Sequence, residues 1–138
     1  MSHKRKTFDH GFSEEMWEAG KKVARDAMKA AAHRGSKGRG DYTISYSDLV
    51  GVIRAEVPIL DLEPHDIRLN HMLGEISTEE HKSGRGMLSV VVVHQGGDKM
   101  PGSGFFDLAK SLGRNTKDWM KCWTDELERI FQENSNRI

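Results

Sequence analysis

The sequence predicts an α+β fold: a helix-rich domain with a small antiparallel sheet of two or three strands. Two observations predict this class. Over most of the chain, apolar and small residues recur every three or four positions, which is typical of amphipathic helices. Only one stretch, residues 87–94 (Met-Leu-Ser-Val-Val-Val-Val-His), holds enough consecutive β-branched residues to indicate a longer strand. A chain of 138 residues is long enough to bury its own core, so we expect a single domain.

The chain is expected to divide into a flexible basic arm over 1–12, one domain over 13–134 and a frayed tail over 135–138. No apolar run approaches the roughly 20 residues that span a bilayer. The basic N-terminal residues are not followed by the apolar core of a secretory signal. The single cysteine, Cys122, excludes an internal disulfide and suits a reducing compartment. These observations predict a cytoplasmic protein that does not enter a membrane.

The charges cancel over the whole chain but not along it. Lys plus Arg number 21, and Asp plus Glu number 21. Residues 1–41 hold 10 basic and 6 acidic residues, residues 42–86 hold 4 and 8, and the remainder holds 7 and 7. Because phosphates attract a basic surface, overall neutrality argues against a general nucleic-acid binder but leaves a local basic patch possible.

A first helix is expected from about residue 14 to 33. Ser13 suits the N-cap, and Glu14 and Glu15 suit the first turn, where the helix dipole favours negative charge. The small and apolar residues at helical spacing define the buried stripe: Met16, Gly20, Val23, Ala27 and Ala31. Four basic residues fall largely outside that stripe and predict a basic outer side: Lys21, Lys22, Arg25 and Lys29.

The middle of the chain predicts one short strand and three helical segments. A strand over 42–44 should run directly into a helix over 46–56, because Ser45 and Asp48 match a capping box. Pro64 suits the first position of the next helix, which should end near residue 73. A second capping-box match, Ser77 with Glu80, predicts a separate helical segment over 78–82.

The strand over 87–94 is expected to be covered on both faces, because successive side chains of a strand alternate. The two glycines in residues 95–101 predict a tight turn and a short returning strand, which together form a hairpin. A helix over 105–112, capped by Ser103, and a last helix, capped by Asn115 or Thr116, should close the fold.

This order of elements, with a hairpin after two inner helices, is that of a winged helix. Three segments carry a nearer resemblance: Ile44–Leu49, Leu88–His94 and Met100–Phe106. They resemble small bacterial proteins that are similar to the winged-helix DNA-binding part of alkylguanine alkyltransferases, over roughly residues 42 to 112. The chain lacks the reactive Pro-Cys-His-Arg setting of those enzymes, so the resemblance implies docking on DNA without alkyl transfer.

The leading hypothesis is therefore a non-catalytic nucleic-acid-binding protein with DNA or RNA as partner. Its candidate contacts are basic residues of the glycine-rich loops and polar residues of the inner helix: Lys37, Arg39, Arg85, Arg68, Asn70 and His71. The alternative interpretation is that the loops and the helix face are simply solvated, since Asp61, Glu63, Asp66 and Glu75 would repel phosphates.

Two further hypotheses stay open. Trp119, Trp123 and Phe131 on the last helix could bind a protein partner or a second copy of the chain. A metal-dependent hydrolase using His71, Glu75 and His94 is a distant third. No His or Cys spacing completes a set of three ligands, so we assign no metal, no cofactor and no catalytic residue.

Overall fold

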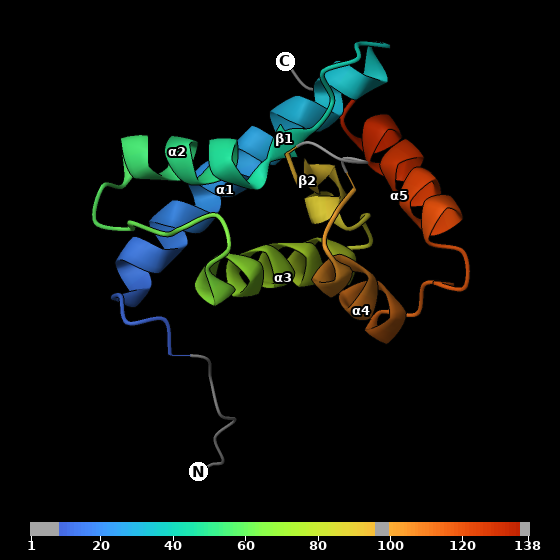
Figure 1. The fold of residues 1–138 in the computed structure, drawn as a ribbon. Coiled ribbons are helices and arrows are strands. Elements are labelled where there is room, and N and C mark those ends of the chain that lie inside the picture. The colour runs from blue at the N-terminus through green and yellow to red at the C-terminus, as the bar shows by residue number, and fades with distance from the viewer. Residues whose placement is uncertain (1–8, 96–99, 136–138) are drawn as a thin grey trace.

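The computed structural model describes residues 9–95 and 100–135. Within them the chain is rich in helix, with five α-helices around a sheet of two strands (Figure 1). The elements in order are α1 (Glu14–Ser36), β1 (Ile44–Ser45), α2 (Tyr46–Glu56), α3 (Ile67–Lys82), the 3₁₀ helix η1 (Leu88–Val91), β2 (Val92–Val93), α4 (Ser103–Ser111) and α5 (Trp119–Glu133). None of the described helices is long and apolar enough to cross a membrane.

The helix starts follow local capping chemistry. The side chains of Ser13 and Ser45 accept backbone N–H groups at the starts of α1 and α2, which confirms both predicted caps. Asp66 caps α3 and Asp118 caps α5. The prediction that Asn115 or Thr116 starts the last helix is wrong, because Asp118 supplies the capping oxygen for a helix that begins at Trp119.

Helix α3 is continuous, where the sequence predicted a break before residue 78. The second capping-box match is wrong because Ser77 lies buried inside the helix. Its hydroxyl donates to the hydroxyl of Ser89 at 2.7 Å and accepts the backbone N–H of Ser89 at 2.9 Å. The serine joins α3 to η1, and the helix continues because its apolar side is covered along its whole length.

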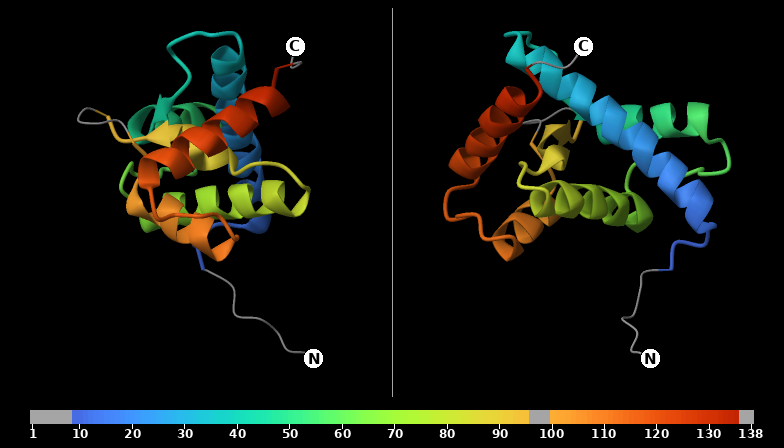
Figure 2. Two further views of the ribbon diagram at one scale, coloured as in Figure 1. Left: turned by 90° about the vertical axis from the view of Figure 1, so that its right-hand side faces the viewer. Right: turned by 180° about the vertical axis from the view of Figure 1, so that it is seen from behind.

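The valine run is buried as predicted, but it is not a long strand. Leu88–Val91 form η1, and only Val92–Val93 form β2. The run lies in the middle of the fold, where η1 contacts α1, α3 and α5 (Figure 2). Helices surround η1 instead of neighbouring strands, and an apolar run alone does not distinguish a buried strand from another buried segment.

The sheet is parallel, so the predicted antiparallel pairing is wrong. Ile44 pairs with Val92 and Ser45 pairs with Val93. The expected glycine turn falls on residues 96–99, outside the described part of the chain. The residues that flank this segment are joined by a hydrogen bond from the backbone N–H of His94 to the carbonyl of Met100, at 3.2 Å. The strand that pairs with the valine run is thus the early segment before α2.

The basic residues of α1 do not all lie on an outer side, which corrects the prediction. Lys21 is only 2% exposed, and its ammonium group contacts the carboxylates of Glu75 and Glu79 on α3. Arg25 also bonds to Glu79. The basic excess of the first segment and the acidic excess of the second therefore meet across the α1/α3 interface, where they neutralise each other.

Residues 9–12 of the predicted arm pack against the body, whereas residues 1–8 lie outside the described part. His10 is 6% exposed and stacks on Trp17 with ring centroids 4.0 Å apart. The guanidinium of Arg68 lies over the ring of Phe12, with Cζ 5.1 Å from the ring centroid, which is a cation–π contact. His10 and Phe12 thus belong to the packed body of the domain.

Candidate functional site

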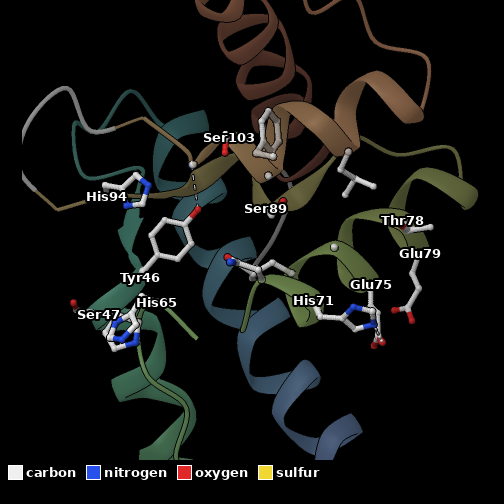
Figure 3. A pocket seen from close by; sticks show the side chains of 18 of the residues that line it. Tyr46, Ser47, His65, His71, Glu75, Thr78, Glu79, Ser89, His94 and Ser103 are labelled. Carbon is white, nitrogen blue, oxygen red and sulfur yellow. Dashed lines mark hydrogen bonds and ion pairs between the residues drawn. The ribbon is translucent and has the colours of Figure 1, made fainter. Parts of the chain in front are cut away.

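A cavity of about 980 Å³ opens between α3, the start of α4 and the ends of the two strands (Figure 3). Its volume is near the upper end of the roughly 300–1,000 Å³ typical of ligand sites. Six of the polar residues that line it are Tyr46, His65, His71, Glu75, His94 and Ser103. Leu73, Phe105 and Leu108 add apolar surface. The lining combines apolar walls with convergent polar groups, as ligand-binding pockets do.

The parallel strands bring their carboxyl ends to this cavity. β1 continues directly into Tyr46 and Ser47, and β2 continues into His94 and Gln95, and all four residues line it. In parallel α/β structures, ligands bind outside the carboxyl ends of the strands, where the following helices begin. The two short strands place the starts of α2 and α4 around one hollow in the same way.

The first turn of α4 presents backbone donors to the cavity. Gly102 is the N-cap, and no side chain of the described residues caps this helix. The first turn also contains no acidic residue, and no described residue accepts the N–H of Ser103 or Gly104. Such a helix start carries a partial positive charge and favours an anion. The prediction that Ser103 caps the helix is wrong, because Ser103 is its first residue.

Two side chains converge on this helix start. The backbone N–H of Gly102 donates to the hydroxyl oxygen of Tyr46 at 3.2 Å. A Cβ atom at Gly102 would lie 3.2 Å from Nε2 of His94 and 3.4 Å from the Tyr46 hydroxyl, so a glycine allows this close approach. The rings of Tyr46 and His94 have centroids 4.9 Å apart. Burial raises the pKa of Tyr46, and the Gly102 bond only partly opposes it, so the phenol keeps its proton as a donor.

The opposite wall of the cavity belongs to α3. His71 and Glu75 are one turn apart, with 3.0 Å between Nε2 and Oε2. Oε1 of Glu75 accepts the indole N–H of Trp17 at 2.9 Å and lies 3.2 Å from the ammonium of Lys21. Glu79 follows one turn later and is held by the same Lys21. This wall presents carboxylates whose orientation is set from behind by α1.

The residues predicted to bind nucleic acid do not gather at one place. Asn70 and His71 line the cavity. Arg68 pairs with Asp66 at the start of α3, at 2.8 Å, and is turned toward Phe12. The guanidinium of Arg68 thus stabilises the start of α3 through the capping residue Asp66.

The three loop cations lie on two loops beside the C-terminal half of α5. Arg39 binds Asp41 at 2.8 Å, and Arg85 binds the buried Glu80 at 2.7 Å. Lys37 is exposed and has no ion pair with any described residue. Gly35, in the last turn of α1 before the first loop, lies against the ring of Phe131, and the N–H of Gly86 in the second loop donates to Glu133 at 2.9 Å. Both loops therefore lie next to contacts with α5.

The aromatic residues proposed as a partner surface are mostly used inside the domain. The indole N–H of Trp123 donates to the carbonyl of Val90 at 3.2 Å, and Phe131 packs edge-on against Tyr42. Trp119 stacks on Phe106 with centroids 4.2 Å apart and still leaves 48% of its surface exposed. Only Trp119 therefore offers a substantial open surface among these three.

The metal hypothesis finds no ligand set in the described part of the chain. No group of three or more His, Cys, Asp and Glu residues is placed to hold a metal ion there. His71 and Glu75 share one wall of the cavity, but His94 lies on the opposite wall (Figure 3). Cys122 is buried, and that burial raises the pKa of its thiol, in keeping with a structural role.

No family model, no curated protein and no solved structure matches this chain. The resemblance to the alkyltransferase DNA-binding part therefore stays a prediction. The sequence hypotheses placed His94 in a metal site and Ser103 at a helix cap, and they assigned no functional role to Tyr46. Their convergence depends on the parallel pairing of two-residue strands, for which the sequence carries no visible signal.

Proposed function

We propose that the protein binds a small organic anion in the cavity between α3 and α4, with its phosphate or carboxylate group at the first turn of α4. One observation carries this proposal: the uncapped start of α4, His94 and Tyr46 converge on Gly102 at the mouth of a cavity of about 980 Å³. Backbone N–H groups, a phenol and an imidazole are all able to donate hydrogen bonds to an anion.

The electrostatics favour this end of the cavity for negative charge. The four other described α-helices each begin with a side-chain cap from Ser or Asp, so a side chain already accepts an N–H of each first turn. In this proposal, the anionic group of the ligand accepts the N–H groups at the start of α4, as a capping side chain does in the other α-helices. Phe105 and Leu108 beside it would bury the apolar part of the ligand and exclude water, which strengthens each polar contact.

A matched pair of substitutions in one helix tests the site. Ser103→Asp adds a negative charge at the first turn of α4 and should weaken the binding of inorganic phosphate or acetate about tenfold or more, because the two anions repel each other. Ser111→Asp makes the same change at the other end of α4 and should leave affinity within about twofold. Aspartate is itself a favourable residue in a first helical turn, so weaker binding would not come from unfolding.

The measurement is a titration followed by the amide resonances of residues 102–105. We expect phosphate or acetate to shift these resonances first. Shifts confined to the exposed loop cation Lys37, or no shift at millimolar concentrations of either anion, would contradict the proposal.

Nucleic-acid binding and a winged-helix-like body remain a second candidate, as the resemblance implies. The observation that favours it is Lys37, which is exposed and has no ion pair with any described residue. A gel-shift series with duplex and single-stranded DNA at increasing salt tests it. Retardation that is lost as salt rises would support it, and no retardation at low salt would remove it.

A further inference from the structure

The cavity has a second pole, opposite the start of α4, that contains hydrogen-bond acceptors. We propose that the ligand also carries hydroxyl groups, as a sugar phosphate or a nucleoside phosphate does, and that Glu75 and Glu79 accept their hydrogen bonds. This inference rests on the anion site proposed above and names the class of ligand that would fill the whole cavity.

The two carboxylates are fixed in place before any ligand arrives. Both side chains line the cavity from successive turns of α3. Behind them, the ammonium group of Lys21 is buried between α1 and α3 and contacts both carboxylates. The indole of Trp17 donates to the same Glu75, and Arg25 bonds to Glu79. A site whose acceptors are held by a second layer of residues loses little freedom when it binds.

The carboxylates still have room for further donors. An ionised carboxylate offers about four lone-pair positions. Glu75 is contacted by Trp17, Lys21 and His71, and Glu79 by Lys21 and Arg25, so each carboxylate keeps at least one position open. Glu75 and Glu79 are partly exposed toward the cavity, with side chains 32% and 49% accessible. Partial burial alone would raise the pKa of Glu79, but the bonds and charges of Lys21 and Arg25 outweigh it and lower the pKa, so the group remains an ionised acceptor.

The charge balance of this pole favours neutral donors over a cation. The two negative charges of Glu75 and Glu79 face the positive charges of Lys21 and Arg25. The third carboxylate beside Arg25, that of Glu80, is paired with Arg85. A bound cation would therefore gain little net attraction, whereas a hydroxyl needs only a lone pair. Acidic side chains bind sugar hydroxyls in this way in dinucleotide sites.

The two poles suit one elongated ligand. Figure 3 shows Tyr46, His94 and Ser103 on one side of the cavity and Glu75 and Glu79 on the other. An anionic group at α4 would leave the rest of the molecule to cross the apolar surface of Leu73 and Leu108. Hydroxyl groups at the far end would then reach α3.

Calorimetric titration with three probes tests the inference on the full chain. The probes are inorganic phosphate, ribose 5-phosphate and 2,3-dideoxyribose 5-phosphate, which lacks the 2- and 3-hydroxyls and keeps only the anomeric one. We expect ribose 5-phosphate to bind about tenfold or more tightly than the dideoxy compound, because hydrogen bonds to ionised acceptors are the strong ones. In the variant Glu79→Gln that difference should fall to about threefold or less, while Glu128→Gln on exposed α5 should leave it unchanged.

The outcomes separate this inference from the anion site. Equal affinity for the two sugar phosphates, with phosphate itself still bound, overturns the inference and leaves the anion site in place. Failure of all three probes overturns both. Tighter binding of a diamine such as putrescine than of ribose 5-phosphate shows that the pole selects cations and overturns the inference. The probe comparison uses the unmodified chain, so it holds even where Glu79→Gln disturbs folding.

Discussion

The two sides of α3 use charge and space differently. On the side that faces α1, Lys21 and Arg25 are matched to the carboxylates of Glu75, Glu79 and Glu80. On the side that faces α4, polar groups converge on a cavity, and the α4 start has no capping side chain among the described residues. Opposite charges join α1 to α3 on the first side, whereas the cavity side presents backbone donors, imidazoles, hydroxyls and the exposed parts of Glu75 and Glu79.

The glycines show the same division in terms of space. Away from the cavity, at the contacts with α5, a Cβ atom at Gly35 would overlap the ring of Phe131, and one at Gly86 would lie 2.9 Å from Ile130. On the cavity side, a Cβ atom at Gly74 would have its nearest described neighbour 4.0 Å away, in Leu108. Close packing thus holds the helices together on one side and stops at the cavity on the other.

The largest effect is expected at the buried cation. Lys21→Met should lower the free energy of unfolding by about 2–3 kcal/mol, because it leaves two carboxylates beside α1 without their shared partner. Lys22→Met, at an exposed position one residue along, should change stability by less than about 0.5 kcal/mol. Urea unfolding of both variants measures the difference. Equal stability of the two would show that the closed side does not depend on its ion pairs.

The tight packing between α1 and α5 gives the next largest effect. Gly35→Ala should cost about 1–3 kcal/mol, because the methyl group would push into the ring of Phe131. Gly51→Ala in α2 is the matched control: apart from the neighbouring residues and backbone of α2 itself, no described atom lies within 4 Å of the new methyl group, so it should stabilise the helix by about 0.5–1 kcal/mol. Opposite signs in thermal unfolding support the comparison, and a neutral Gly35→Ala contradicts it.

The start of α3 should show a smaller, pH-dependent effect. Asp66→Ala should cost about 1 kcal/mol at neutral pH, because Asp66 caps α3 and binds Arg68. The hydrogen bonds from Arg68, which outweigh partial burial, lower the pKa of Asp66 from 3.8 to about 2. A lowered folded-state pKa means that this stabilisation is present above pH 3.8 and is lost as the pH falls toward 2.

The difference between wild type and Asp66→Ala should therefore shrink over that acid range. Urea unfolding at several pH values follows it, and a carboxyl NMR titration gives the pKa directly. Arg68→Gln should move the pKa of Asp66 back toward 3.8. A pKa that is already near 3.8 in the wild type would show that Arg68 is not committed to α3 and is available for other contacts.

The smallest expected effect lies on the open side. Gly74→Ala should raise the free energy of unfolding by about 0.5–1 kcal/mol, because alanine favours a helix interior and the cavity has room for the methyl group. Thermal unfolding measures it. If Gly74→Ala instead lowers the free energy of unfolding, the cavity has no room for the methyl group in solution. Gly74 would then be as closely packed as Gly35.

The features that the sequence predicted well are local ones. Ser13 and Ser45 each cap the helix that follows them, because a capping bond spans only three residues and depends little on the rest of the fold. The same local logic failed at Ser77, which matches a capping box but is buried against Ser89. A short motif predicts a helix start only where no tertiary contact competes for the same hydroxyl.

The candidate site depended on contacts between distant segments. Asn70 and His71 were predicted as polar residues of an inner helix, and the structure places them at the cavity. Lys21 was expected on an outer side, since its position on a helix does not reveal that acidic residues 54 and 58 positions later face it. Lys37, Arg39 and Arg85 were grouped by composition, yet two of them already bind carboxylates.

By itself, the sequence determined where α1 and α2 begin, that the chain is rich in helix and that the valine run is buried, because capping and apolar spacing act over a few residues. Tertiary structure decided the rest: two valines pair with Ile44–Ser45 in parallel, and the two oppositely charged segments meet between α1 and α3. Both outcomes depend on which distant segments pack together. The cavity exists because that packing leaves the start of α4 facing α3 across open space.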